Sequence, residues 1–264
     1  MSSTTLDLSN PAVRYNRVPK VTPDFWIIKL LAVTVGETGA DFLAQQMGVG
    51  LANTTWIMSA LLVGVLVLQF SQKRYVPWAY WLAVVFISIV GTLITDYMVD
   101  LAGVSLEMST FLFSGALLAT FATWFASEKT LSIHTIFTTR REAFYWLAIL
   151  FTFALGTAAG DLLAEGLALG YLPTTIIYAC VIALIAGAYF ALGLNSMLAF
   201  WLAYIITRPM GASLGDWLSQ PVANSGLGFG TIVTSFLFLA LIVATLVYMT
   251  RTHDGQDVAE PGNA

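Results

Sequence analysis

The sequence predicts an all-α integral membrane protein in which eight transmembrane helices form four parallel two-helix repeats, arranged as a pseudo-fourfold bundle. Three observations support this fold class: eight long apolar stretches, the distribution of Lys and Arg between them, and a motif that recurs four times. The chain of 264 residues is 58% apolar and only 10% charged, whereas soluble domains average about 45–50% apolar and 25% charged. Such a composition is typical of a multi-pass membrane protein.

Each apolar stretch has about the 20 residues needed to cross a hydrocarbon core of about 30 Å. The eight stretches are residues 25–47, 52–71, 78–101, 108–126, 143–168, 172–193, 195–220 and 227–250. They form a first half, 25–126, and a second half, 143–250, each of two helical hairpin repeats, with a polar leader at 1–24, a cytoplasmic connecting loop at 127–142 and a tail at 251–264. Because the first stretch begins far from Met1, we expect it to be retained and not cleaved as a secretory signal.

Lys and Arg outside the apolar stretches occur only in alternate connections. They are Arg14, Arg17, Lys20, Lys73, Arg74, Lys129, Arg140, Arg141 and Arg251. The opposite loops, near residues 48–52, 102–107, 169–173 and 221–226, contain neither residue type. The positive-inside rule therefore predicts that both termini are cytoplasmic, and we expect the chain in the bacterial inner membrane.

A tryptophan, a glycine and an aspartate recur with fixed spacing in every odd-numbered stretch. The tryptophan and aspartate, 15 positions apart, are Trp26 and Asp41, Trp81 and Asp96, Trp146 and Asp161, and Trp201 and Asp216. Five positions before each aspartate stands Gly36, Gly91, Gly156 or Gly211, and directly before it stands Ala40, Thr95, Gly160 or Gly215. Because each unit has two helices, all four units enter the membrane in the same orientation and form parallel repeats.

The small residues of this motif predict close contacts between helices, since pairs of small residues four positions apart let helix backbones approach in lipid. We therefore expect the odd-numbered stretches to form the inner bundle and the even-numbered stretches to face lipid. The four tryptophans are expected to anchor the inner helices at the cytoplasmic membrane interface, where indole rings are enriched.

Acidic residues are concentrated inside the apolar stretches. They are Glu37, Asp41, Asp96, Asp100, Asp161, Glu165 and Asp216, and only Lys29 and Arg208 lie there to balance them. With a rise of 1.5 Å per residue, the step from tryptophan to aspartate covers about 22 Å, so the four motif aspartates share one depth in the outer half of the membrane. An unpaired charge there costs about 2.5–3.5 kcal/mol or more, which marks these residues as candidates for function.

The two cations have different expected partners. Arg208, followed by Pro209, is expected to pair with a carboxylate such as Asp216 or Glu37. Lys29 lies close enough to the cytoplasmic end for its ammonium to extend toward the interface.

The chemistry of these side chains suggests ion movement. Carboxylates are ligands for Mg²⁺, Ca²⁺ or Mn²⁺, and they also relay protons. The first hypothesis is a transporter or channel for a small cation, with the four motif aspartates as ion and metal ligands and with Glu37, Asp100 and Glu165 along the same path. It implies no enzymatic activity and no resident cofactor, and a lipid bilayer but no nucleic acid as partner.

Two other functions remain open. In a non-catalytic membrane scaffold or anchor subunit, the aspartates would only hold helices together through hydrogen bonds. An intramembrane aspartyl protease is less favoured, because Ala158 and Ser213 stand where a Gly-x-Gly-Asp motif needs glycine. The single cysteine, Cys180, excludes an intrachain disulfide.

Four tandem units with a Gly-x-x-x-x-Asp core, in a chain of this length, resemble a family of uncharacterised bacterial membrane-anchored proteins with tandem transmembrane repeats of unknown function. The resemblance covers about residues 20–250, and the fourth unit departs from the pattern with Arg208 and Pro209 ahead of its glycine. It implies the fold and the membrane location, and no activity.

Overall fold

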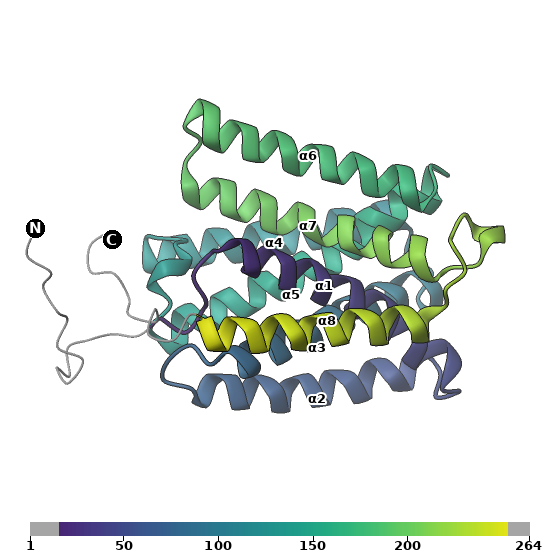
Figure 1. Cartoon of the computed structure of the whole chain (residues 1–264), viewed down its shortest axis with the longest axis horizontal. Helices are drawn as coiled ribbons and strands as arrows, with labels where there is room; N and C mark the ends of the chain where they lie inside the picture. Colours follow the sequence, from purple (N-terminus) through teal and green to yellow (C-terminus); the bar gives the residue numbers. More distant parts are fainter. Residues whose placement is uncertain (1–15, 253–264) are drawn as a thin grey trace, which may run out of the picture.

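The computed structural model describes residues 16–252, which contain eight α-helices and no strand (Figure 1). The helices are α1 (Pro23–Asp41), α2 (Leu51–Ser71), α3 (Pro77–Asp96), α4 (Leu106–Glu128), α5 (Thr139–Asp161), α6 (Tyr171–Leu192), α7 (Ser196–Ser219) and α8 (Thr231–Thr252). Residues 1–15, with Arg14, and residues 253–264 lie outside the described part, as does the side chain of Arg251. The predicted apolar stretches and the observed helices agree closely.

Within residues 16–252, seven helices are long and apolar enough to cross a membrane, namely all except α1. The sequence predicts eight such spans. The difference lies in α1, which carries Asp24, Lys29, Glu37 and Asp41 among its 19 residues. The chain is therefore an all-helical, multi-pass membrane protein with seven candidate spans and a first helix whose charged residues are spread along its length.

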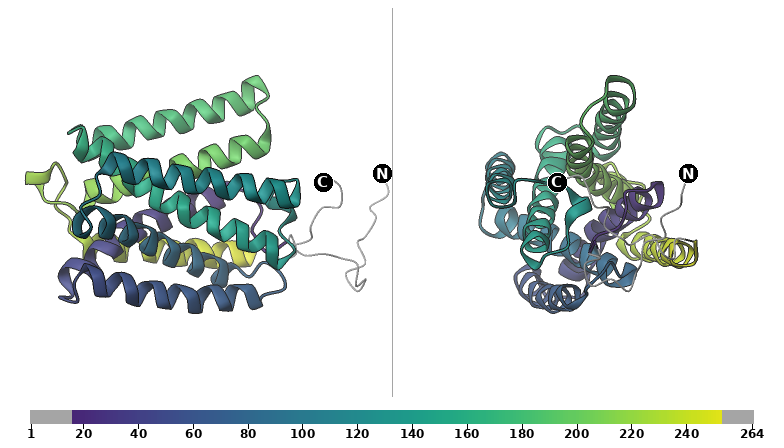
Figure 2. Two further views of the ribbon diagram at one scale, coloured as in Figure 1. Left: turned by 180° about the vertical axis from the view of Figure 1, so that it is seen from behind. Right: turned by 90° about the vertical axis from the view of Figure 1, so that its left-hand side faces the viewer.

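The odd-numbered helices are in contact with one another. α1 packs against α3 and α7, and α5 packs against the same two helices. We call α1, α3, α5 and α7 the inner helices. The end-on view in Figure 2 shows α2, α4, α6 and α8 outside them. The apolar parts of α3, α5 and α7 are more than half buried inside the protein, whereas those of α2, α4, α6 and α8 are mostly exposed.

Each even-numbered helix packs mainly against the inner helix of the following unit. α2 packs against α3, α4 against α5 and α6 against α7, and α8 returns to α1. The two helices of one repeat are therefore neighbours in sequence, but their principal contacts are with other repeats. The two helices of each predicted hairpin are consecutive in the chain, but they are not each other's main packing partners.

Several helices begin where the sequence supplies a standard start signal. Pro23 and Pro77 stand in the first turns of α1 and α3, where the missing backbone N–H removes no helical hydrogen bond. The side chain of Thr138 accepts a hydrogen bond from the backbone N–H of Arg141 at the start of α5. Asn195 caps α7 in the same way.

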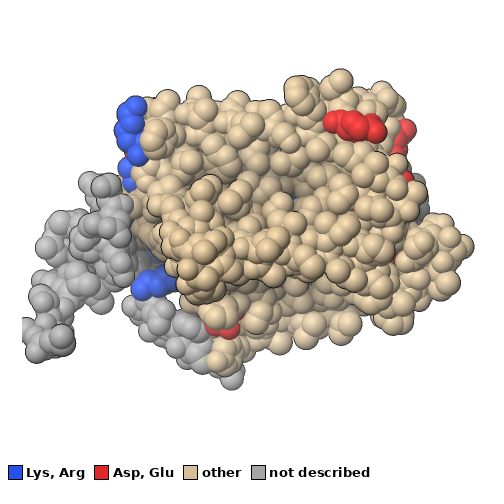
Figure 3. All heavy atoms as spheres, turned by 90° about the horizontal axis from the view of Figure 1, so that it is seen from above, with Lys and Arg blue, Asp and Glu red and all other residues tan. Residues whose placement is uncertain are grey.

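Charge is separated along the bundle. Lys and Arg gather at one end of the molecule, most of the visible acidic atoms lie at the other, and the surface between them carries little charge (Figure 3). The basic end contains exposed Lys20, Lys73 and Lys129. The acidic end contains exposed Asp100 and Glu165. The uncharged band between them matches the surface that lipid tails require.

Candidate functional site: a buried ion pair between the inner helices

The four repeat glycines lie where neighbouring inner helices touch. A Cβ atom at any of them would overlap a side chain of the next inner helix. The pairs are Gly36 with Ser88, Gly91 with Phe153, Gly156 with Arg208, and Gly211 with Val33. The second residue of each pair stands three positions before the glycine of its own helix. One type of contact therefore recurs at all four junctions and brings the helix axes close together.

Gly160 and Gly215 lie one helical turn further along the same junctions. A Cβ at Gly160 would stand 3.5 Å from the hydroxyl of Ser213, and one at Gly215 would stand 3.3 Å from the Cγ2 of Thr38. These are ordinary or slightly tight contacts, so the second pair of glycines is less constrained than the first four.

The position directly after each repeat glycine faces the centre of the inner helices. It is Glu37, Thr92, Thr157 or Ala212. The guanidinium of Arg208 donates to Glu37 Oε2 at 2.9 Å, to Thr92 Oγ1 at 2.5 Å and to Thr157 Oγ1 at 2.8 Å. Thr92 also donates to Glu37 Oε2 at 3.1 Å. Arg208 is 0% and Glu37 4% exposed, so all four inner helices meet at one buried ion pair.

This central cluster, defined as Glu37, Thr92, Thr157 and Arg208, follows from the departure of two repeats from the common pattern. Only the first unit has an acid after its glycine, and only the fourth has an arginine three positions before it. The pairing of Arg208 with Glu37, one of the two partners expected from sequence, is what the structure shows. A buried charge is tolerated only when paired and hydrogen-bonded, and Arg208 meets this condition with two η nitrogens while its Nε has no partner.

Lys29 lies next to the central cluster and is completely buried. Its ammonium donates to the backbone carbonyl of Tyr204 at 2.9 Å and lies 3.9 Å from the centre of the Tyr204 ring. The ring of Phe153 is 5.8 Å from the Lys29 ammonium and 5.3 Å from the Arg208 guanidinium. No ion pair of Lys29 occurs among residues 16–252. The sequence predicts that Lys29 extends toward the interface. This prediction is wrong, because the side chain remains inside the bundle.

The four motif aspartates lie on the acidic side of the central cluster. Each stands four positions after the central residue of its helix, and thus on the same helix face. Asp41, Asp96 and Asp161 are half-buried, whereas Asp216 is buried. The side-chain amide of Gln220 donates to Asp41 at 3.2 Å.

Three of these aspartates stand at a change of helix type. A π-helical segment follows directly in the first three units: Phe42–Gln46, Tyr97–Leu101 and Leu162–Gly166. The wider π turn rotates the residues beyond the aspartate relative to an α-helix, and such segments are frequent at functional sites. The fourth unit has no π segment after Asp216, since α7 continues to Ser219 and a 3₁₀ turn, Val222–Asn224, follows.

Asp100 and Glu165 are exposed at the acidic end. Tyr171 donates its hydroxyl hydrogen to Glu165 at 2.8 Å. Within residues 16–252, no three His, Cys, Asp or Glu side chains are grouped closely enough to hold a metal ion. The arrangement thus gives no support to Asp41, Asp96, Asp161 and Asp216 as joint ligands of one metal.

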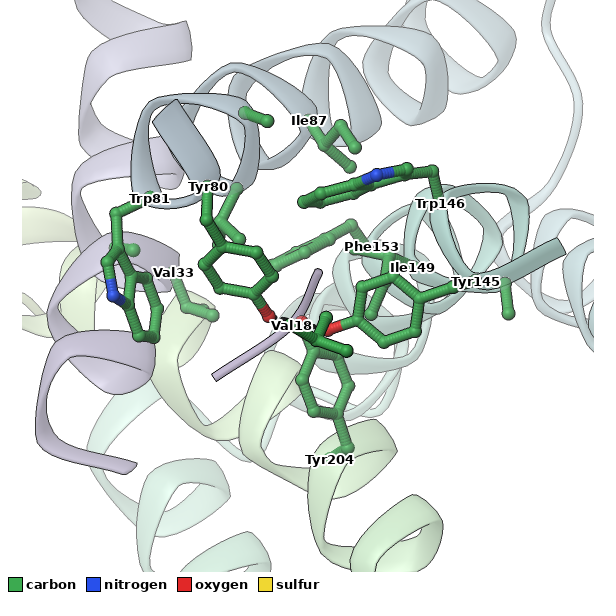
Figure 4. Packing of buried hydrophobic residues seen from close by; sticks show 14 of the residues in the cluster. Val18, Val33, Tyr80, Trp81, Ile87, Tyr145, Trp146, Ile149, Phe153 and Tyr204 are labelled. Atoms are coloured by element: carbon green, nitrogen blue, oxygen red, sulfur yellow. Dashed lines mark hydrogen bonds between the residues drawn. The ribbon is translucent and has the colours of Figure 1, made fainter. Parts of the chain in front are cut away.

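The motif tryptophans lie toward the basic end in a cluster of aromatic rings, and Figure 4 shows two of them, Trp81 and Trp146, with Tyr80, Tyr145 and Tyr204. Trp81, Trp146 and Trp201 are at most 4% exposed, and only Trp26 is half-buried. Trp201 packs edge-on against Trp124 with ring centres 5.8 Å apart. Three of the four indoles therefore lie inside the protein, where they hold the inner helices together, and not on the lipid-facing surface that interfacial anchoring requires.

Sequence reasoning did not select the residues that close this basic end. The residue before each motif tryptophan is also aromatic: Phe25, Tyr80, Tyr145 or Phe200. An aromatic residue at the same position of all four repeats is a sequence signal that could have identified these residues. The hydroxyls of Tyr80 and Tyr145 lie 2.5 Å apart. Asn16 donates to the carbonyl of Ile133 at the same end, and Arg17 forms an ion pair with Glu142 there. Nothing in the repeat pattern marks Asn16, Arg17 or Glu142.

Four units of two helices, in a chain with seven candidate spans, define a multi-pass membrane protein built from internal repeats. The family model described as Repeat of Unknown Function (DUF347) matches residues 25–75, 79–130, 144–193 and 199–254, and the chain belongs to this family. The family resemblance read from the sequence is thereby confirmed. No curated protein and no solved structure matches the chain.

Proposed function

We propose that this protein is a transporter or channel for a small cation in the bacterial inner membrane, with no chemical conversion of its substrate and no resident cofactor. The observation that carries the proposal is the buried pair of Glu37 and Arg208 at the meeting point of all four inner helices. Half-buried aspartates stand on one side of this pair, and Lys29 stands next to it. A scaffold needs no such costly charges at its centre.

In this mechanism the acidic end collects cations. Asp100 and Glu165 at the surface and the half-buried aspartates behind them produce a negative potential that raises the local concentration of cations. Glu37 is the next carboxylate inward, and Arg208 occupies it. A cation or proton that reaches Glu37 competes with Arg208, so the ion pair is the barrier to movement.

We further propose that all eight helices cross the membrane around a pseudo-fourfold axis, with both termini cytoplasmic. The four equivalent glycine contacts support the symmetry. The charged residues of α1 explain why it is not among the seven candidate spans. However, Lys29 and Glu37 are buried between the inner helices, and α8 packs along α1. Because those charges face protein and not lipid, α1 can span the bilayer.

This topology predicts that reporters fused to the two ends of the chain behave alike. Green fluorescent protein at either end should fluoresce in the cytoplasm, and alkaline phosphatase at either end should be inactive. The same phosphatase inserted between Gly48 and Gly50, at the acidic end, should be active. An active phosphatase at only one terminus would mean an odd number of spans and would refute the eighth span.

Replacing Asp161 with Asn should reduce cation entry by about tenfold or more, because the amide keeps the size of the side chain but removes a carboxylate charge inside the membrane. The measurement uses purified protein in liposomes, with quenching of trapped calcein by Mn²⁺ and the response of trapped pyranine to a pH gradient. Glu107→Gln is the matched control, since Glu107 is an exposed acid at the same end of the molecule on an outer helix.

The alternative, a membrane scaffold, is favoured by one observation: the central cluster is buried and Oε2 of its carboxylate accepts from both Arg208 and Thr92. A scaffold would give no protein-dependent entry of Mn²⁺ or protons in either assay. If Asp161→Asn lowers only the thermal stability and wild-type protein moves neither ion, the transport proposal fails and the scaffold stands.

A further inference from the structure

The segment before α1, residues 16–22, covers the basic end of the inner helices. Its Val18 is only 4% exposed and belongs to the main hydrophobic core. Val18 belongs to the same core cluster as Tyr80, Tyr145 and Tyr204, and in the view of Figure 4 it overlies the hydroxyl ends of these three rings. These three tyrosines come from α3, α5 and α7, so the residues packed in this cluster with Val18 include side chains of three inner helices.

The remaining inner helix contributes Phe25, whose ring centre lies 6.3 Å from that of Tyr204. Lys29, one turn beyond Phe25 along α1, contacts both the backbone carbonyl and the ring of the same Tyr204. Val18 and the tyrosines thus stand between the basic end and Lys29. At the acidic end, by contrast, the half-buried aspartates are in contact with solvent.

Specific polar contacts hold the segment in place. Asn16 donates from its side-chain amide to the carbonyl of Ile133 at 2.9 Å and accepts from the backbone N–H of Ile136 at 3.1 Å. Its own carbonyl accepts from the backbone N–H of Tyr75 at 2.9 Å. Asn16 therefore ties the segment to the loop before α3 and to the loop before α5.

Arg17 adds an ion pair with Glu142 at 2.6 Å. Glu142 is 1% exposed and also accepts from Gln69 at 3.0 Å and from Trp146 at 3.3 Å. Since these two donors remain when Arg17 is removed, the carboxylate of Glu142 keeps partners in the released state. Asn16 and Arg17 form a latch, and when it opens Glu142 keeps these two hydrogen-bond donors but loses its counter-ion.

We propose that residues 16–18 are a gate: Val18 plugs the basic end of the inner bundle, and the latch of Asn16 and Arg17 releases it as a unit. The segment is held by a few hydrogen bonds, each worth about 0.5–1.5 kcal/mol net, by the ion pair of Arg17 with Glu142 and by the burial of Val18. Breaking this local set of contacts opens the segment more readily than the helices behind it unfold. The proposal extends the proposed function by stating where the path is closed. The test below measures how fast a reagent reaches a buried cysteine, so its result does not depend on whether the protein transports ions.

The experiment measures reagent access to a cysteine behind the plug. Cys180→Ser removes the only native cysteine, and Ile149→Cys places a reporter one turn beyond Tyr145, at a site that is 0% exposed. Purified protein in detergent is treated with the small methanethiosulfonate ethylsulfonate anion. In the background of Asn16→Ala and Arg17→Ala, the reporter should react about tenfold faster or more, since local opening sets the rate.

Two controls separate opening of the gate from general loosening. Lys20→Ala, at an exposed position of the same segment, should leave the rate unchanged. A second reporter, Ala158→Cys, is also 0% exposed but lies further along α5 against α4, and its rate should not rise in the latch variant. Equal rates at Ile149→Cys with and without the latch would overturn the proposal, and so would an equal increase at both reporters.

The same latch variant in liposomes distinguishes this inference from the proposed function. Faster labelling together with faster Mn²⁺ or proton entry supports both. Faster labelling with no entry in wild-type or variant protein leaves the gate established and refutes transport.

Discussion

Glu37→Gln should lower the free energy of unfolding by about 3–5 kcal/mol, because among residues 16–252 it removes the only carboxylate paired with the completely buried Arg208. The amide is nearly the same size as the carboxylate, so packing changes little. Arg208 would keep its two threonine partners but lose its counter-ion, with Lys29 as a second cation beside it. Unfolding by sodium dodecyl sulfate in mixed micelles, followed by tryptophan fluorescence, measures the loss.

A second substitution tests whether the loss comes from the unpaired charge. Adding Arg208→Met should restore most of the stability, since a neutral side chain of similar length leaves nothing to compensate. Glu128→Gln serves as the control for loss of an acidic charge: Glu128 pairs with Arg141 at a more exposed site, and its replacement should cost less than about 1 kcal/mol. If the double variant is no more stable than Glu37→Gln alone, the pair is not what stabilises the centre.

Gly156→Ala should lower the free energy of unfolding by about 1–3 kcal/mol from overpacking at the junction of α5 and α7. The added methyl group would overlap the Cβ and Cγ of Arg208 and approach Pro209 to 3.1 Å. Because Pro209 is rigid, the arginine has to move, and its bonds to Thr157 and Glu37 break with it. The same unfolding assay measures the cost, and the Mn²⁺ assay should show altered entry.

Gly64→Ala provides the matched control. Gly64 is also in the middle of a helix, but a Cβ there meets nothing within 4 Å. Alanine has the higher helix propensity, so this variant should be neutral or more stable by up to about 1 kcal/mol. Equal stability of the two variants would show that the junction of α5 and α7 is not tightly packed.

The repeat motif made much of this architecture predictable. The positions of Gly36, Gly91, Gly156 and Gly211 indicated which helices approach closely, and hydropathy located the helices. The ion pair of Glu37 and Arg208 was among the expected pairings, because two departures from one repeat pattern stood out. Neither inference needed knowledge of contacts between distant residues.

Other features depend on three-dimensional packing that periodicity does not encode. The tryptophans carry the usual signal of an interfacial residue, yet Trp81, Trp146 and Trp201 are enclosed because neighbouring units supply aromatic partners. Lys29 is long enough to reach the interface but is held by the carbonyl of Tyr204. The π segments after Asp41, Asp96 and Asp161 have no evident sequence signal.

The return of α8 to α1 has a consequence for biosynthesis. The ribosome releases α1 first, but its inner neighbour α7 and its outer cover α8 are the last two helices to be made. α1, which carries the buried charges Lys29 and Glu37, therefore waits longest for the partners that shield them, and a chain truncated before α7 leaves Glu37 without Arg208. The inner bundle can therefore be completed only after α7 and α8 have been made, because these helices supply the contacts that α1 lacks until then.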